Sequence, residues 1–386
     1  MMIMLIDHTR DFVHAGAMQF DPTDLSQTTA AVFFTRWITH YCAPVFVFLA
    51  GTSIFLQKLN GKSNAELSRF LWTRGLWLVI LEFTVVRFGV AFNLDYSGSF
   101  GMVQVIWVIG ISMIVMAALI YLPIKAVGAV GVGMIALHNL FDRFQVPPET
   151  AFMGTPPPDL SQILLMVFHQ QGVVPIPGTS GLFVAYPLIP WIGVMAAGYA
   201  FGLLYAAERG RRRKWLTVLG VTLTLLFVVI RLTNAYGDPS AWSVQDTPGF
   251  TFLSFLNTTK YPPSLVFVLM TLGPAMLVLA VTDNIDGKAI WQRICITFGR
   301  VPMFFYILQW FTAHLAGILL SWLAGKDISY FFGNVMAGGQ MPPADAGFPL
   351  WVVYAAWLGG LIIMYPLCAW WGGLKRQNKH WVFSYL

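Results

Sequence analysis

The segment LIDHTRDFVHAG, residues 5–16, gathers two histidines, two aspartates and an arginine beside apolar stretches. An imidazole has an ordinary pKa near 6.5, so a histidine can accept a proton from a substrate at neutral pH. On a helix, His8 and Asp11 are three residues apart and Asp7 and Asp11 are four apart, so each pair shares a face and an acid there can orient an imidazole. The segment therefore predicts a general base, His8 or His14, with an aspartate partner. The plainer alternative is a polar helix end that leaves a membrane.

A second polar pair, Arg36 and His40, lies in FFTRWITHYCAP at residues 33–44. The two are four residues apart and so share a helix face, where they could donate hydrogen bonds to a developing oxyanion. The alternative is an interfacial anchor, because Trp37 and Tyr41 are typical of the aromatic belt of a membrane.

Glu82 lies near the middle of an apolar segment, and Arg87 follows it. A charge at such a position is costly in a bilayer and is a functional hypothesis by default. We give equal weight to a contact with substrate and to a buried structural hydrogen bond.

The composition predicts the fold class that must position these residues. The chain has 386 residues, of which 57% are hydrophobic and 10% charged, against about 25% charged in soluble domains. Several apolar runs reach the roughly 20 residues that cross a bilayer as helix. We expect an all-α, polytopic transmembrane bundle forming one domain over residues 1–386. The nine expected spans are at about 35–57, 70–92, 101–122, 124–141, 181–206, 215–232, 261–281, 295–323 and 350–371.

The first apolar residues, MMIMLI, are too few for a further span. Six residues rise only about 9 Å as helix, whereas the hydrocarbon core is roughly 30 Å thick. We expect them to be the end of a tenth, first helix whose start is truncated or misassigned. The stretch DHTRD follows instead of a small-residue cleavage site, so no cleavable signal peptide is expected.

The distribution of basic residues predicts orientation. RGRRRK, residues 209–214, lies in a short loop, where the positive-inside rule indicates the cytoplasm. The net charge of +6 is therefore topological, and no nucleic-acid partner is expected. If successive spans cross the membrane in alternating directions from this cytoplasmic loop, the C-terminus lies in the cytoplasm. Six of the seven histidines then lie on the outer side: His8, His14, His40, His138, His169 and His314. The long outer segments 142–180, 233–260 and 324–349 suit binding loops.

Several chemistries are not supported. Cys42, Cys295 and Cys368 are scattered at no metal-ligand spacing, and none lies among the outer histidines. This argues against a metal site, a disulfide framework and a covalent acyl-cysteine. Nucleotide-binding glycine motifs and the GxSxG motif are absent from the sequence.

Five blocks in order resemble the bacterial relatives of heparan-α-glucosaminide N-acetyltransferase, and the resemblance covers nearly the whole chain. The blocks are DHTRDFVHAG, FFTRWITHYCAPVFVFLAG, YPLIPWIGVMAAGYAFG, KYPPSLVFVLMTLGPA and FGRVPMFFY. These enzymes take acetyl-CoA from the cytoplasmic side and acetylate a sugar on the opposite side. The resemblance thus implies a multi-pass protein of the bacterial inner membrane, with acetyl-CoA or another acyl-CoA as donor, an outer-face sugar or glycan as acceptor, and basic cytoplasmic residues at the CoA phosphates. The oligomeric state stays open, with a homodimer as one option.

The family also implies a catalytic histidine in the first outer loop. Its aromatic-x-His-Ala pattern matches Phe12 to Ala15 and makes His14 the first choice, while its asparagine falls where Asp7 and His8 stand here. Which histidine is the base therefore stays open. The complete predicted site comprises His14, His8, Asp7 and Asp11 as catalytic residues, and Arg36, His40 and Glu82 as contacts to the substrate or the oxyanion.

Two other functions compete with acyl transfer. A transporter or flippase could use Glu82, Arg87 and Arg231 as a polar path through the bundle, although no inverted repeat is visible in the sequence. An inactive scaffold is the third possibility.

Overall fold

A computed structural model describes residues 1–17, 19–96, 101–333, 342–378 and 380. The chain divides into two compact units, which we describe separately. The first unit comprises Met1–Cys42, Thr84–Ser99 and Asn284–Leu386, and the second comprises Ala43–Phe83 and Phe100–Asp283. Residues 334–341, which are part of the predicted outer segment 324–349, lie outside the described residues.

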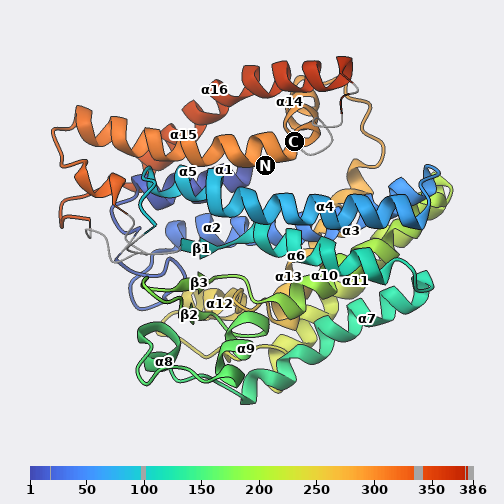
Figure 1. Cartoon of the computed structure of the whole chain (residues 1–386), viewed down its shortest axis with the longest axis horizontal. Coiled ribbons are helices and arrows are strands. Elements are labelled where there is room, and N and C mark those ends of the chain that lie inside the picture. The colour runs from blue at the N-terminus through green and yellow to red at the C-terminus, as the bar shows by residue number, and fades with distance from the viewer. Residues whose placement is uncertain (18, 97–100, 334–341, 379, 381–386) are drawn as a thin grey trace. The chain divides into compact units, whose positions relative to one another are not determined.

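The first unit brings together helices from both ends of the chain. Its elements are α1 (Met2–Val13), α2 (Ala30–Thr39), α5 (Arg87–Ala91), α14 (Ile290–Arg300), α15 (Pro302–Leu323), the 3₁₀ turn η4 (Ser329–Phe332) and α16 (Leu350–Gln377). The helix α1 packs against both α15 and α16, and the latter two lie side by side (Figure 1). The helix α1 continues for 12 residues through the charged cluster, so the polar residues from Asp7 to Asp11 are helical, whereas His14 follows the helix in an extended conformation.

The second unit contains the remaining helices. They are α3 (Cys42–Leu59), α4 (Asn64–Leu81), α6 (Val105–Leu119), α7 (Ile124–Leu137), α8 (Pro148–Met153), α9 (Leu160–Phe168), α10 (Leu188–Phe201), α11 (Arg209–Thr233), α12 (Pro248–Leu256) and α13 (Leu265–Thr282), with the short turns η2 (His138–Arg143) and η3 (Gly202–Ala206). A π-helical segment, η1 (Glu82–Val86), follows α4.

Close helix pairs in the second unit depend on glycine. A Cβ on Gly75 of α4 would lie 2.5 Å from the carbonyl oxygen of Gly110 on α6, and one on Gly131 of α7 would lie 2.8 Å from that of Gly193 on α10. Such distances are impossible for a real Cβ, so only glycine allows these backbones to approach. Small residues at helix contacts are typical of membrane bundles, where packing rather than hydrophobicity joins helices.

The purely α-helical prediction is wrong for a small part of this unit. Three strands of three residues each, β1 (Gly101–Val103), β2 (Gly172–Val174) and β3 (Leu182–Val184), form a sheet in the order β1-β3-β2. β3 is parallel to β1 and antiparallel to β2. Residues 101–103 and 182–184 were expected to begin membrane helices, but Val and Phe suit strands as well, and long-range pairing decides.

Among the described residues, seven helical segments are long and apolar enough to cross a membrane, so the count of nine spans is not confirmed. These seven are Ala30–Leu59, Ile124–Arg143, Leu188–Ala206, Arg209–Thr233, Leu265–Thr282, Pro302–Leu323 and Leu350–Gln377. The two other expected spans correspond to the shorter Val105–Leu119 and to α4, which carries several charged residues. Exposed apolar side chains such as Leu225 (59%) and Ile362 (74%) suit contact with lipid.

The expected span 295–323 is divided in two. Val301 has φ −126° and ψ 53°, which ends α14, and Pro302 is the first residue of α15. The ring of a proline disfavours helical geometry in the residue before it, while proline itself is well tolerated at the first helical position.

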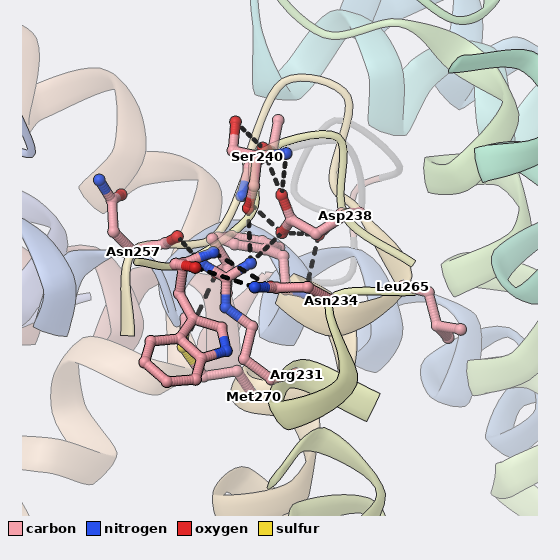
Figure 2. Close-up of polar contacts among 12 residues, drawn as sticks. Arg231, Asn234, Asp238, Ser240, Asn257, Leu265 and Met270 are labelled. Carbon is pink, nitrogen blue, oxygen red and sulfur yellow. Dashed lines mark hydrogen bonds and ion pairs between the residues drawn. The ribbon is translucent and has the colours of Figure 1, made fainter. Parts of the chain in front are cut away.

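The C-terminal end of α11 carries a buried polar hub, shown in Figure 2. Arg231 is 2% exposed and lies 3.9 Å from Asp238. Asp238 in turn accepts hydrogen bonds from the Thr259 backbone and from the Ser264 hydroxyl. The guanidinium also donates to four backbone carbonyls, those of Ser240, Ser254, Phe255 and Asn257. One cation therefore fixes the connection between α11 and α13.

Replacing Arg231 with methionine should destabilise the protein by about 3–5 kcal/mol, because it leaves Asp238 and four carbonyls buried without their donor. Thermal unfolding in detergent and limited proteolysis within residues 235–259 measure the effect. Arg213→Met, an exposed change on the same helix, is the control. Equal unfolding temperatures for the two variants would contradict the assignment.

Candidate active site

The polar residues of α1 form one connected network in the first unit. Arg36 of α2 donates to Asp7, and Arg10 lies 3.6 Å from the other oxygen of Asp7. Arg10 also donates to Asp11 at 2.6 Å, and the second oxygen of Asp11 lies 3.4 Å from Nδ1 of His8. Cations and anions thus alternate from Arg36 to Asp11, and the sequence of contacts ends on an imidazole. We call these five residues the α1 network.

Burial explains why the charges are paired. Asp7 is 8% exposed and Arg10 is 4% exposed, so neither is well solvated. An isolated buried charge costs several kcal/mol, and a partner with good geometry offsets that cost. The two carboxylates and two guanidinium groups have no net charge together.

His8 has one face covered. Its ring centroid lies 3.8 Å from that of Trp310 on α15, at an interplanar angle of 41°. Trp310 is itself buried, at 4% exposed, and Phe12 meets it edge-on. The His8 side chain is 14% exposed. The indole therefore shields one face of the imidazole and restricts how it can turn.

His14 follows the last residue of α1 and is positioned by backbone pairing. The N–H of Ala15 donates to the carbonyl of Phe348 at 2.9 Å, and the N–H of Phe348 donates to Val13 at 2.8 Å. Gly347 permits this approach, because a Cβ there would lie 2.6 Å from Cα of Ala15.

The His14 ring is oriented by its own turn. Its Nδ1 accepts a hydrogen bond from the N–H of Gly16 at 3.2 Å. In a neutral imidazole one nitrogen accepts and the other carries the proton, so this contact places the proton on Nε2. Burial, and next the Arg10 guanidinium, lower the pKa of His14 below its ordinary value of 6.5. The neutral ring therefore presents an N–H donor.

The other predicted contacts occupy different places. Arg36 joins the α1 network, whereas His40 is the buried C-terminal cap residue of α2, one turn later. Glu82 belongs to the second unit, where the N–H of Trp107 donates to its carboxylate at 2.9 Å. Trp107 lies in the first turn of α6, where backbone N–H groups have no partner within the helix. Glu82 therefore accepts from one of these N–H groups and stabilises the N-terminus of α6. This is the structural alternative for Glu82 that the sequence left open.

Two features of the site escape sequence reasoning. Trp310 is one aromatic residue among many in an apolar span, and nothing local connects it with His8. The pairing of Phe348 with the end of α1 joins residues more than 300 positions apart. Among the described residues, no three His, Cys, Asp or Glu side chains are grouped to hold a metal ion.

The lowered pKa of His14 predicts that its ring stays mostly neutral at pH 6.5. Diethyl pyrocarbonate reacts with neutral imidazole. The pH at which the labelling rate of His14 is half of its maximum, measured by peptide mass mapping, should therefore lie below 6.5. Arg10→Met should raise that midpoint without reaching 6.5, since burial is the larger cause. Labelling of exposed His380 should not respond to the substitution. A midpoint for His14 at or above 6.5 would contradict this environment.

Comparison with known proteins agrees with the resemblance seen in the sequence. The family model described as heparan-alpha-glucosaminide N-acetyltransferase, catalytic, matches residues 4–231, which include α1 and α2. No curated protein matches the chain. Because the family match covers more than half of the 386 residues, the chain belongs to the family of the heparan-alpha-glucosaminide N-acetyltransferase catalytic domain, which consists of transmembrane acetyltransferases.

Proposed function

We propose that this multi-pass membrane protein transfers an acyl group, in the first place acetyl, from cytoplasmic acyl-CoA to an amine or hydroxyl of an outer-face sugar or glycan. Its location is the inner membrane of a bacterium, with the C-terminus in the cytoplasm and the basic loops near the CoA phosphates. The observation that carries the proposal is the α1 network, a balanced group of ions that ends on the His8 imidazole.

His8 is the general base in this proposal. The Asp11 carboxylate lies 3.4 Å from Nδ1 of His8 without forming a hydrogen bond in this structure; we propose that the contact shortens when substrate binds, which puts the proton on Nδ1 and leaves a free lone pair on Nε2. Hydrogen bonds of catalytic groups are often long before substrate binds. Arg10 donates to the other oxygen of Asp11 at 2.6 Å and so holds this carboxylate in place. This reverses the preference for His14 that the resemblance suggested.

His14 is then the donor in the site. Its Nδ1 lone pair accepts from Gly16, so we assign its Nε2–H to an oxygen that gains negative charge. The lowered pKa of His14 supports the same role, because a neutral ring keeps this donor in one tautomer.

The reaction needs no covalent enzyme intermediate. Nε2 of His8 takes the proton of the acceptor amine or hydroxyl, whose nitrogen or oxygen forms a bond to the thioester carbonyl carbon. Nε2–H of His14 stabilises the resulting oxyanion. The C–S bond then breaks, the carbonyl re-forms, and the thiolate leaves and takes the proton from His8. A thioester is already activated, so positioning and proton transfer suffice.

The remaining predicted residues support this arrangement. Asp7 holds Arg36 and Arg10 rather than an imidazole in the contacts described above, so we assign it a positioning role, and Asp11 orients His8. Arg36 anchors the network from α2. His40 remains a proposed substrate contact, and Glu82 is proposed as a structural cap rather than an oxyanion donor.

The transporter alternative receives less support. A conducting path needs polar groups that can serve a passing substrate. Arg87 donates to the carbonyls of Asn93 and Asp95, Arg231 donates to four carbonyls, and Glu82 caps α6. Each of the three makes hydrogen bonds that stabilise local structure, although Oε1 of Glu82 and Nε of Arg87 have no hydrogen-bond partner among the described residues, and we therefore rank the transporter function second.

The two histidines should respond differently to glutamine. His14→Gln keeps a side-chain N–H donor near the position of Nε2 and should retain a substantial part of the acetyl-transfer rate. His8→Gln removes the base and should lower kcat by roughly 100-fold or more. The assay follows labelled acetyl from acetyl-CoA into an envelope-glycan extract, using purified protein in liposomes.

Gln57→Glu, which changes a half-buried residue of α3 outside the α1 network, is the control for purification and for insertion into liposomes. Transfer by His8→Gln at the wild-type rate, with His14→Gln inactive, would return the role of base to His14. Absence of transfer by the wild type with every extract would contradict the proposed function.

A further inference from the structure

The α15 helix carries buried polar atoms without hydrogen bonds at Trp310, which contacts the proposed base, and at its chain neighbour Gln309. Gln309 is 0% exposed, and within the described residues neither its Oε1 nor its Nε2 has a hydrogen-bond partner. The ring of the next residue, Trp310, packs against that of His8 at a tilt, and its Nε1 likewise has no partner within the part of the chain described. Three unsatisfied polar atoms thus lie on one turn of the helix that packs against α1.

Such atoms are expensive in a membrane protein. A buried polar group without a partner loses its hydration and gains nothing in return, and a hydrocarbon core offers no water. Most buried polar groups in folded proteins are therefore paired, and the exceptions require an explanation. Two other polar side chains of α15 follow the rule: the hydroxyl of Thr312 donates to the carbonyl of Leu308, and both nitrogens of His314 face carbonyl oxygens.

A carboxamide offers one donor and one acceptor in a fixed plane, which complements the C=O and N–H of a secondary amide. The acyl donor of the proposed reaction carries two secondary amides on the pantetheine arm that ends in the thioester. That thioester must reach His8, and Trp310 is the residue against which His8 packs. The indole N–H adds a further donor suited to a carbonyl.

We propose that Gln309 and Trp310 bind the amide groups of the pantetheine arm and so align the thioester with His8. This inference rests on the proposed function and adds residues of α15, which lies beyond the matched residues 4–231. Gln309 then acts as a specificity residue that distinguishes an amide-bearing thioester from one without an amide.

The test uses two short acetyl thioesters of equal length, S-acetyl-N-acetylcysteamine and its analogue with an ester in place of the amide. The full-length wild type should prefer the amide donor by about tenfold in kcat/KM, because the ester leaves the Gln309 oxygen unsatisfied. Gln309→Leu should reduce that ratio to about one. Thr312→Val, which removes a hydroxyl already bonded within the helix, should keep the wild-type ratio.

A second readout needs no turnover. Ligand-free Gln309→Leu should melt at a higher temperature than the wild type, since two unsatisfied atoms are gone, while added CoA should raise its melting temperature less. If Gln309→Leu keeps the tenfold preference, the inference is wrong. It is also wrong if Gln309→Leu melts at a lower temperature than the wild type, as expected for a structural glutamine that bonds to water. Either result leaves the acyltransferase proposal intact. A change confined to the KM for the glycan would overturn it as well. A wild type inactive with both donors overturns the proposed function together with it.

Discussion

Charge neutralisation within α1 is the constraint on which the rest of the site depends. Asp7, Arg10 and Asp11 lie on α1 and Arg36 lies on α2, and Asp7 and Arg10 are too buried for water to compensate their charges. They stabilise one another only when α1 is helical through Asp11 and when α2 brings Arg36 to Asp7. The same requirement fixes Asp11 next to His8. The position of the proposed base is thus a consequence of how the ions are paired.

The surrounding elements keep that helix in place by backbone and indole contacts. Trp357 of α16 donates to the carbonyl of Met2 at 2.8 Å, near the start of α1. At the other end, Phe348 pairs with the backbone on either side of His14, and Lys326 donates to the carbonyl of Gly347 at 2.6 Å. α1 is therefore held at both ends, while Trp310 covers the imidazole between them. A site built on a helix fixed in this way needs little rearrangement to orient a proton acceptor.

Local spacing in the sequence predicted part of this site. The intervals from Asp7 and from His8 to Asp11 each predicted a shared helix face, and α1 runs through all three residues. The contact between Arg36 and Asp7 spans 29 positions and that between His8 and Trp310 spans about 300, so no local pattern could reveal them. The tautomer of His14 depends on the turn that returns Gly16 to its ring. For the fold, the length of the apolar runs predicted most membrane helices. The short strands depend on pairing between distant segments, and the helix break at Val301 depends on the restriction that Pro302 places on the residue before it.

The central claim is that Asp11 acts on catalysis through His8. The direct measurement is a double-mutant cycle on kcat/KM for acetyl transfer, with Asp11→Asn and His8→Gln made singly and together. Asp11→Asn should lower kcat/KM at least about tenfold when His8 is present. It should change kcat/KM little when His8 is already glutamine. Full additivity of the two losses would contradict it, because Asp11 would then act independently of the imidazole beside it.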